Sequence, residues 1–262
     1  CREVIRLKNP DVKFIINDFS PIIFRKSFIN AILKGFYIKK PISLELEDFK
    51  EKMFELQTTF PEFSEVVDFY LQQMNINNYK FKPVLLVGNI GREKLFVDSL
   101  LKVFQENSGL THFIYNCETL PADYFNSLSL QPEGGNLLKI ISLIDHPNFF
   151  MSFYNVDKNS HLLPLLIEVV DPKLNSNVLD VSTSIRYNAE HINHIATAND
   201  LSKLSKDFTQ CFEVFQLKPM TKEQMKKYIE MEWLNLISKI DIELHKPIPD
   251  NVLEQLSKYS YI

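Results

Sequence analysis

The segment Lys82–Phe104 reads KPVLLVGNIGREKLFVDSLLKVF and has the order strand, loop, helix. A short apolar run leads into Gly88, a loop follows, and an amphipathic pattern begins near Lys94. This is the order found around the phosphate-binding loop G-x-x-x-x-G-K-[ST]. From Gly88 onward the chain reads GNIGREKL, so Glu93 replaces the second glycine and Leu95 replaces the hydroxyl residue. The segment therefore predicts the outline of a phosphate loop without its full chemistry.

The composition is that of an ordinary globular protein. Of the 262 residues, 45% are hydrophobic and 24% are charged, and the net charge is −4. Because no block of Lys and Arg forms a basic field, no nucleic-acid partner is indicated. The apolar runs are too short to cross a bilayer, and the first residues lack the order of a signal peptide. Cys1, Cys117 and Cys211 have no disulfide or zinc spacing, which favours a reducing, cytoplasmic setting.

Helical and strand patterns divide the chain into three parts. Apolar residues recur at helical spacing in 20–36, 43–57 and 63–74, ahead of a polar connector. After it, short apolar runs at 84–87, 113–115, 149–154, 192–197 and 213–217 alternate with helical segments, as in a parallel sheet with helical crossovers. We therefore expect an α/β protein with an N-terminal helical extension at 1–79, a large α/β domain at 80–217 and the start of a helical lid at 218–262.

The expected lid contains two helices. Thr221 and Gln224 form a capping-box pattern that predicts a helix start, and its apolar stripe runs from Met225 to Ile240. The segment 247–250 interrupts this pattern, and a last helix is expected to begin near Asp250.

The ends of the third and fourth strands are where a P-loop nucleoside triphosphatase carries its catalytic groups. Such a site needs a carboxylate at a buried strand end for Mg²⁺ and a group that orients the attacking water. Here the third strand ends in Tyr154 and Asn155, where an Asp-Glu pair is wanted. The fourth strand ends in a polar tip at 196–200. The residues themselves therefore predict no carboxylate pair at this edge.

Three later segments carry a family pattern. They read LIEVVDPKLN at 166–175, IATAN at 195–199 and FEVFQL at 212–217. They resemble the AAA+ ATPase module of Lon-type proteases and its small bacterial relatives, and FPEFSEVV at 60–67 is similar to the lead-in of those relatives. The likeness covers roughly residues 60–240, and LIEVVDP with ATAND is its most specific part. It implies a five-stranded parallel sheet in the order 5-1-4-3-2, flanking helices and a helical lid.

The resemblance assigns roles to several residues. Gly88, Gly91 and Lys94 stand in the phosphate loop, and Asn199 stands at the sensor-1 position, which helps to place the attacking water. Asp157 and Lys158 match an Asp-Lys pair that follows the catalytic carboxylates in the family. Each residue also has a structural interpretation: Lys94 as a solvated lysine at a helix start, and Asn199 as a cap for the turn after its strand.

Other positions depart from the family. Glu93 and Leu95 change the loop, Tyr154 and Asn155 replace the Walker B carboxylates, and Cys211 falls at the arginine-finger position. The sensor-2 arginine would come beyond residue 262. Glu93 restricts a backbone that needs glycine and adds negative charge near the phosphates. Leu95 and Tyr154 offer no oxygen ligand of the kind that Mg²⁺ takes, so no metal is assigned to these positions.

We interpret the chain as a degenerate AAA+ module of Lon-like ancestry. The hypothesis is a pseudo-ATPase with weak or no ATP binding and no hydrolysis, which acts as a scaffold or binds other protein subunits, including an active AAA+ assembly. No cofactor is predicted for it. The alternative binds ATP or ADP with Mg²⁺ through Lys94, takes missing groups from neighbouring subunits and drives protein remodelling. A third interpretation is an unrelated P-loop-like binding module, in which 88–95 need not lead into the N-terminus of its helix.

Overall fold

The computed structural model describes residues 16–18, 46–74, 81–88, 90–108, 111–119, 149–180, 185–187, 189–190, 192–218, 221–240 and 248–259. The helix expected at 20–36 lies outside these residues, as does the start of the helix expected at 43–57.

Five parallel strands form the large sheet. They are β2 (Val84–Val87), β3 (Thr111–Asn116), β4 (Phe149–Tyr154), β7 (Ile192–Ala198) and β8 (Glu213–Gln216). Their spatial order is β3-β4-β7-β2-β8, with parallel pairing between all neighbours. Counted along the chain from the β8 edge, this is 5-1-4-3-2, so the expected fold class and strand order are confirmed. The predicted bounds of β2 and β4 agree residue for residue.

The two central strands, β2 and β7, are buried along their whole length. Burial along a whole strand is typical of parallel strands that are covered on both faces. Val87 is paired with Ala198, so the two strands end side by side. Gly88 then donates its backbone N–H to the Ala198 carbonyl at 2.9 Å. The loop after β2 and the polar tip after β7 therefore leave the sheet at the same point.

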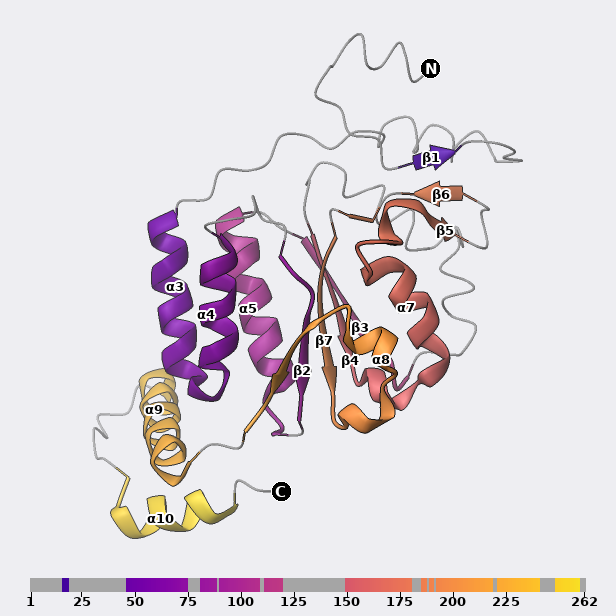
Figure 1. The fold of residues 1–262 in the computed structure, drawn as a ribbon. Helices are drawn as coiled ribbons and strands as arrows, with labels where there is room; N and C mark the ends of the chain where they lie inside the picture. Colours follow the sequence, from indigo (N-terminus) through magenta and orange to yellow (C-terminus); the bar gives the residue numbers. More distant parts are fainter. Residues whose placement is uncertain are drawn as a thin grey trace.

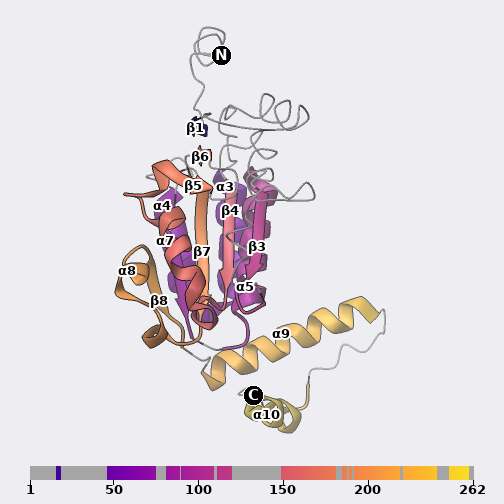
Figure 2. The same ribbon diagram turned by 90° about the vertical axis from the view of Figure 1, so that its right-hand side faces the viewer.

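Helices cover both faces of this sheet (Figure 1). On one face lie α3 (Leu46–Thr59), α4 (Ser64–Met74) and α5 (Glu93–Ser108). On the other lie α7 (Leu163–Val170) and the short α8 (Lys206–Thr209). Helices α9 (Lys222–Ile240) and α10 (Asp250–Tyr259) lie beyond the edge where the strands end (Figures 1 and 2).

The start of α9 has the capping box expected from the sequence. The Thr221 backbone N–H donates to Gln224 Oε1 at 2.9 Å, and the Gln224 N–H donates to Thr221 Oγ1 at 3.2 Å. This exchange satisfies two backbone donors that a helix start leaves unpaired. Helix α10 begins at Asp250, as expected. Among the described helices, none combines the length and apolar character needed to cross a bilayer.

A second, smaller sheet was not expected from the sequence. Its antiparallel strands β1 (Ile16–Asp18), β5 (Val178–Asp180) and β6 (Ile185–Tyr187) run in the order β1-β6-β5. It lies at the opposite edge of the large sheet from α9 and α10 (Figure 1). Each strand has three residues, too few for an alternating pattern to be recognised.

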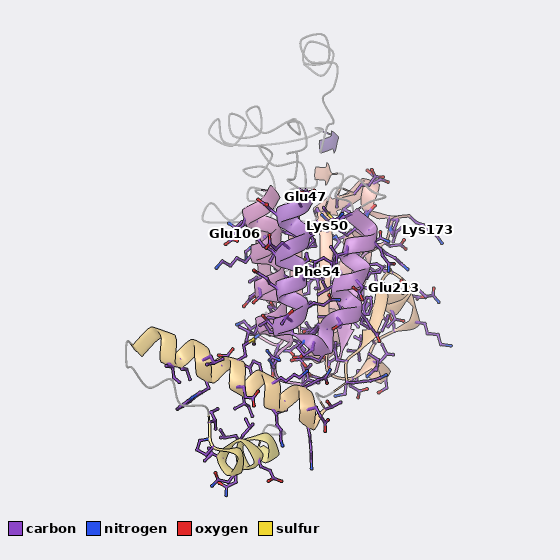
Figure 3. The ribbon with its side chains drawn as sticks, turned by 90° about the vertical axis from the view of Figure 1, so that its left-hand side faces the viewer. Glu47, Lys50, Phe54, Glu106, Lys173 and Glu213 are labelled. Carbon is purple, nitrogen blue, oxygen red and sulfur yellow. The ribbon has the colours of Figure 1, made fainter. Side chains whose placement is uncertain are left out.

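Helix α3 is amphipathic and separates the core from solvent. Its inner residues Phe49 and Met53 are completely buried. Its outer face carries Glu47 and Lys50, together with Phe54, whose side chain is among the exposed apolar residues (Figure 3). The helix therefore packs its apolar stripe against α4 and α5, as the spacing of its apolar residues requires.

Aromatic side chains fill the space between this helical layer and the sheet. The Tyr70 ring lies 5.3 Å from that of Phe81, 5.6 Å from that of Phe104 and 6.3 Å from that of Phe150. These are edge-to-face arrangements, which the ring quadrupole favours. Several of the many Phe residues in the sequence thus pack in the core.

Replacing Tyr70 with Phe is expected to stabilise the protein by about 1 kcal/mol. Tyr70 is fully buried, and its hydroxyl has no hydrogen-bond partner among the described residues. Burial also raises the pKa of this phenol above its ordinary value. An unsatisfied buried donor costs about 1–3 kcal/mol, whereas the ring contacts survive the substitution. The free energy of unfolding in urea measures the change, and a loss of stability in Y70F would contradict the assignment of an unpaired hydroxyl.

Candidate functional site

A small polar pocket lies where the central strands end. Its volume is about 140 Å³, and its walls come from the loop after β2, the start of α5 and the ends of β3, β4 and β7. Parallel strands present their carboxyl ends at one edge, which is where α/β proteins bind ligands. The lining residues are Gly88, Glu93, Lys94, Ile114, Asn116, Tyr154, Asn155, Thr197 and Asn199.

Most of the site residues proposed from the sequence meet in this pocket. Those that line it are Gly88, Glu93, Lys94, Tyr154, Asn155 and Asn199. Gly91, Leu95 and Cys211 are not among its lining residues. The structure adds Ile114, Asn116 and Thr197, which sequence analysis did not single out. The only signal for them was their position at or near the end of an expected strand.

Two glycines give the loop its shape. Gly88 has φ +143°, and a Cβ there would lie 3.0 Å from Leu217 Cβ. Gly91 has φ +77°, in the left-handed region that glycine tolerates best. The loop then runs directly into α5, whose first residue is Glu93. The segment 88–95 therefore leads into the N-terminus of its helix, as a phosphate loop does.

The Glu93 side chain folds back onto this loop. Its Oε1 accepts a hydrogen bond from the backbone N–H of Ile90. The spacing of three residues is that of a capping box, and a carboxylate is favoured at a helix N-terminus by the helix dipole. In a phosphate loop, backbone N–H groups at such a point bind the anionic ligand. Here an anion from the chain itself takes one of these donors.

Lys94 is the cation of the pocket. It is exposed and makes no hydrogen bond or ion pair with any residue that the structure describes. Its ammonium group is therefore available to an anion from outside. The adjacent Leu95 is 53% exposed and contributes no oxygen to the pocket.

Tyr154 is bound to α5 and does not act as a metal ligand. Its hydroxyl donates a hydrogen bond to Asp98 Oδ1 at 2.9 Å. Burial, together with the negative charge of Asp98, raises the pKa of the Tyr154 phenol above its ordinary value. A protonated phenol offers Mg²⁺ no anionic oxygen. The residues at this strand end therefore do not fit the Mg²⁺ that a P-loop nucleoside triphosphatase holds.

Asn155 occupies the next position with an unusual backbone. Its φ of 57° and ψ of 46° are left-handed, a conformation that Asn tolerates better than most residues. Its backbone N–H donates to Thr197 Oγ1 at 3.1 Å, which ties β4 to β7. Its side-chain amide nitrogen lies 3.4 Å from both Asn116 Oδ1 and Glu118 Oε2. Asn155 is thus held in an amide-rich network and carries no acid-base group.

Asn199 is positioned by a buried carboxylate. Its backbone N–H donates to Asp157 Oδ1 at 3.0 Å, and Asp157 lies in a short 3₁₀ helix, Val156–Lys158. Asp157 is buried. The Asp of the Asp-Lys pair therefore has a structural task, which is to fix the turn after β7.

Cys211 lies in the turn before β8. Its thiol is directed to the Asp207 carbonyl at 3.2 Å. Burial raises the pKa of this thiol, and the nearby carboxylates of Asp171 and Asp207 raise it further. A protonated, buried thiol is a poor nucleophile. Within the described part of the chain, no three His, Cys, Asp or Glu side chains gather as a metal site.

Arg92, the residue before Glu93, has partners that sequence analysis missed. Its Nη1 lies 2.6 Å from Glu62 Oε1, and its Nη2 donates to the Thr59 carbonyl at 3.1 Å. Burial raises the pKa of Glu62, although Arg92 acts in the opposite direction. Glu62 lies in the FPEFSEVV segment, whose likeness to the family lead-in was the signal in the sequence that this segment matters. It did not show that Arg92 would be the partner.

Comparison with solved structures identifies the fold. A chain of Hsp104 from S. cerevisiae, in an extended conformation with casein, has a TM-score of 0.64, 13% identity and an alignment over 90% of this chain. Hsp104 in a closed state with ATPγS and FITC casein has a TM-score of 0.61 and 11% identity over 82%. This chain covers 47% and 44% of those chains, about half their length. Comparisons with protein-family models and with curated proteins give no match. The strand order and these likenesses together show that the chain has the AAA+ ATPase fold.

Proposed function

We propose that this chain is a Lon-like AAA+ module that binds ATP weakly or not at all, does not hydrolyse it, and acts as a scaffold or partner-binding module. The observation that carries the proposal is the hydrogen bond from the Ile90 N–H to the Glu93 carboxylate, inside the loop where phosphates bind in this fold. A phosphate would have to displace this carboxylate and approach its negative charge. The end of β4 supports the proposal independently, because Tyr154 places there a phenol that donates to Asp98, and not a carboxylate.

The Lon-like ancestry and the domain limits are parts of the same proposal. The LIEVVDP segment forms the later part of α7 and the turn after it, and the ATAND segment forms the end of β7 and the residues that follow it. We assign 1–79 to an N-terminal extension, 80–217 to the α/β domain and 218–262 to the start of a lid. Both Hsp104 structures contain another protein, casein. By analogy, we place a protein partner, in a cytoplasmic setting, before any other class of ligand for this chain.

A second function is favoured by one observation. Lys94 lines the pocket and has no partner among the described residues, so a cation is available to a phosphate. In this alternative the chain binds ATP or ADP with Mg²⁺, neighbouring subunits complete the site, and the assembly remodels proteins. A neighbour can supply an arginine. It cannot easily replace a strand-end carboxylate within this chain.

Titration with ATP and Mg²⁺ separates the two functions. With a Kd near 1 mM, ligand at about 1 mM stabilises the protein by only about 0.4 kcal/mol, so we expect almost no shift of the melting temperature. We also expect no phosphate release. K94A is the matched variant. A large stabilisation that K94A removes would establish nucleotide binding, and turnover that K94A abolishes would overturn the pseudo-ATPase proposal.

A further inference from the structure

The Arg92 guanidinium contacts two aromatic rings from distant parts of the chain. Its Cζ lies over the Phe60 ring, 4.6 Å from the centroid, and over the Tyr228 ring, 3.9 Å from the centroid. Phe60 belongs to the connection between α3 and α4, whereas Tyr228 lies in α9. Each contact is a cation–π interaction, and such contacts strengthen when the cation is removed from water.

An ion pair fixes the same guanidinium from another direction. The side chain of Glu62 is 1% exposed and that of Arg92 is 13% exposed, so the pair at 2.6 Å is largely shielded from water. The hydrogen bond to the carbonyl of Thr59, the last residue of α3, adds a second anchor. A buried carboxylate needs its partner, because a lone buried charge is strongly destabilising. Arg92 is therefore held in place by the connection between α3 and α4, and its guanidinium lies against Tyr228 of α9.

The position of α9 makes the Tyr228 contact important. Helix α9 crosses beyond the end of the helical layer and lies next to α10 (Figures 2 and 3). Tyr228 is on the half of α9 nearer β8, where the helix passes the phosphate loop. The Arg92–Tyr228 stack thus joins the lid helix to the same loop that contains Ile90 and Glu93.

We propose that Arg92 is a latch that couples the docking of α9 to the conformation of the phosphate loop. While Tyr228 covers the guanidinium, Arg92 is held against Glu62 and Phe60, and the loop keeps the geometry in which Ile90 faces Glu93. When α9 moves away, the loop loses one of the contacts that hold Arg92. Because coupling between two sites is reciprocal, a rearrangement of the loop loosens α9 to the same extent. The latch is independent of nucleotide binding, so it stands whether or not the proposed function is correct.

Hydrogen exchange of the whole chain tests both directions of the coupling. In Y228A, the backbone amides of 90–94 are expected to exchange about ten- to thirtyfold faster, the factor that corresponds to losing a cation–π contact of about 1.4–2 kcal/mol. In R92K, the amides of α9 are expected to exchange faster by a similar factor. Lysine keeps the charge in that variant but lacks the planar group that lies over the two rings.

Two matched variants distinguish a latch from simple weakening of the helix. Y228F keeps the ring over the guanidinium and is expected to accelerate exchange at 90–94 much less than Y228A does. L234A removes an exposed side chain of the same helix and is expected to leave 90–94 unchanged. Exchange in β2 and β7 is measured in the same experiment. The proposal is overturned if Y228A leaves the loop unchanged, if L234A accelerates the loop equally, or if the loop effect does not exceed the change in β2 and β7.

Discussion

Replacing Glu93 with glycine is expected to raise the affinity for ADP about a thousandfold. In the parent chain the Glu93 carboxylate lines the pocket and accepts the Ile90 N–H. Two like charges about 4 Å apart at an effective dielectric of about 20 repel by about 4 kcal/mol, which is close to a factor of a thousand. Glycine removes this charge and frees the backbone donor of Ile90. Lys94, already without a partner among the described residues, then becomes the counter-charge for the phosphates.

Isothermal titration of the variants with ADP measures this gain. E93Q provides an intermediate step, because it removes the charge but leaves a side-chain oxygen that can still accept the Ile90 N–H. The expected order of affinity is therefore E93G above E93Q above the parent. E51Q is the matched control, since it removes one carboxylate from the exposed face of α3, outside the pocket lining. Adding K94A to E93G should cancel the gain. A gain below tenfold, or an equal gain in E51Q, would show that Glu93 is not the barrier.

Recovered binding should not restore hydrolysis. Tyr154 and Asn155 would still end β4, and the Tyr154 hydroxyl would still be bound to Asp98. The electrostatic and positioning groups that phosphoryl transfer requires would remain absent from this strand end. Under the proposed function, the loop is the barrier to nucleotide binding and the end of β4 is the separate barrier to hydrolysis.

The parts of the fold that could be predicted are those specified by local patterns. The apolar run 84–87 lies between polar neighbours, and the strand occupies those residues. Thr221 and Gln224 are three residues apart, and they exchange the hydrogen bonds that this spacing allows. The strand order required more than local patterns, because it came from the family resemblance of the LIEVVDP and ATAND segments. The position of the loop at the start of α5 was predicted from both the local pattern of the segment and the family resemblance.

What could not be predicted depends on residues that are distant in the chain. Tyr154 and Asp98 are separated by 56 positions, and Arg92 and Glu62 by 30. Nothing in either local sequence specifies such a partner, because the pairing is set by how α5 packs against the sheet and against the connection between α3 and α4. The self-binding of Glu93 is local, with the spacing of a capping box, and could have been recognised. Sequence analysis treated Glu93 only as a missing glycine with a repelling charge.

Replacing Phe96 with alanine is expected to destabilise the protein by about 3–5 kcal/mol, the range for removing a large buried aromatic side chain. Phe96 lies in the first turns of α5 and is completely buried. Its ring is stacked on Phe63 with centroids 4.1 Å apart and an interplanar angle of 7°, and it contacts Phe60 edge-on at 5.7 Å. The truncation would therefore leave a cavity between α5 and the segment that also carries Glu62.

Urea unfolding of F96A measures this loss, and L95A is the neighbouring control. Leu95 is 53% exposed, so its truncation should change the free energy of unfolding by less than about 0.5 kcal/mol. The contrast between adjacent residues follows from helix geometry, because one faces the core and the next faces solvent. In an active phosphate loop the Leu95 position would carry the metal-binding hydroxyl, whereas Phe96 serves only the scaffold. A large effect at Phe96 with none at Leu95 would mean that the stability of the chain depends on the packing beneath the loop and not on the side chain at position 95. Similar losses in both variants would contradict that conclusion.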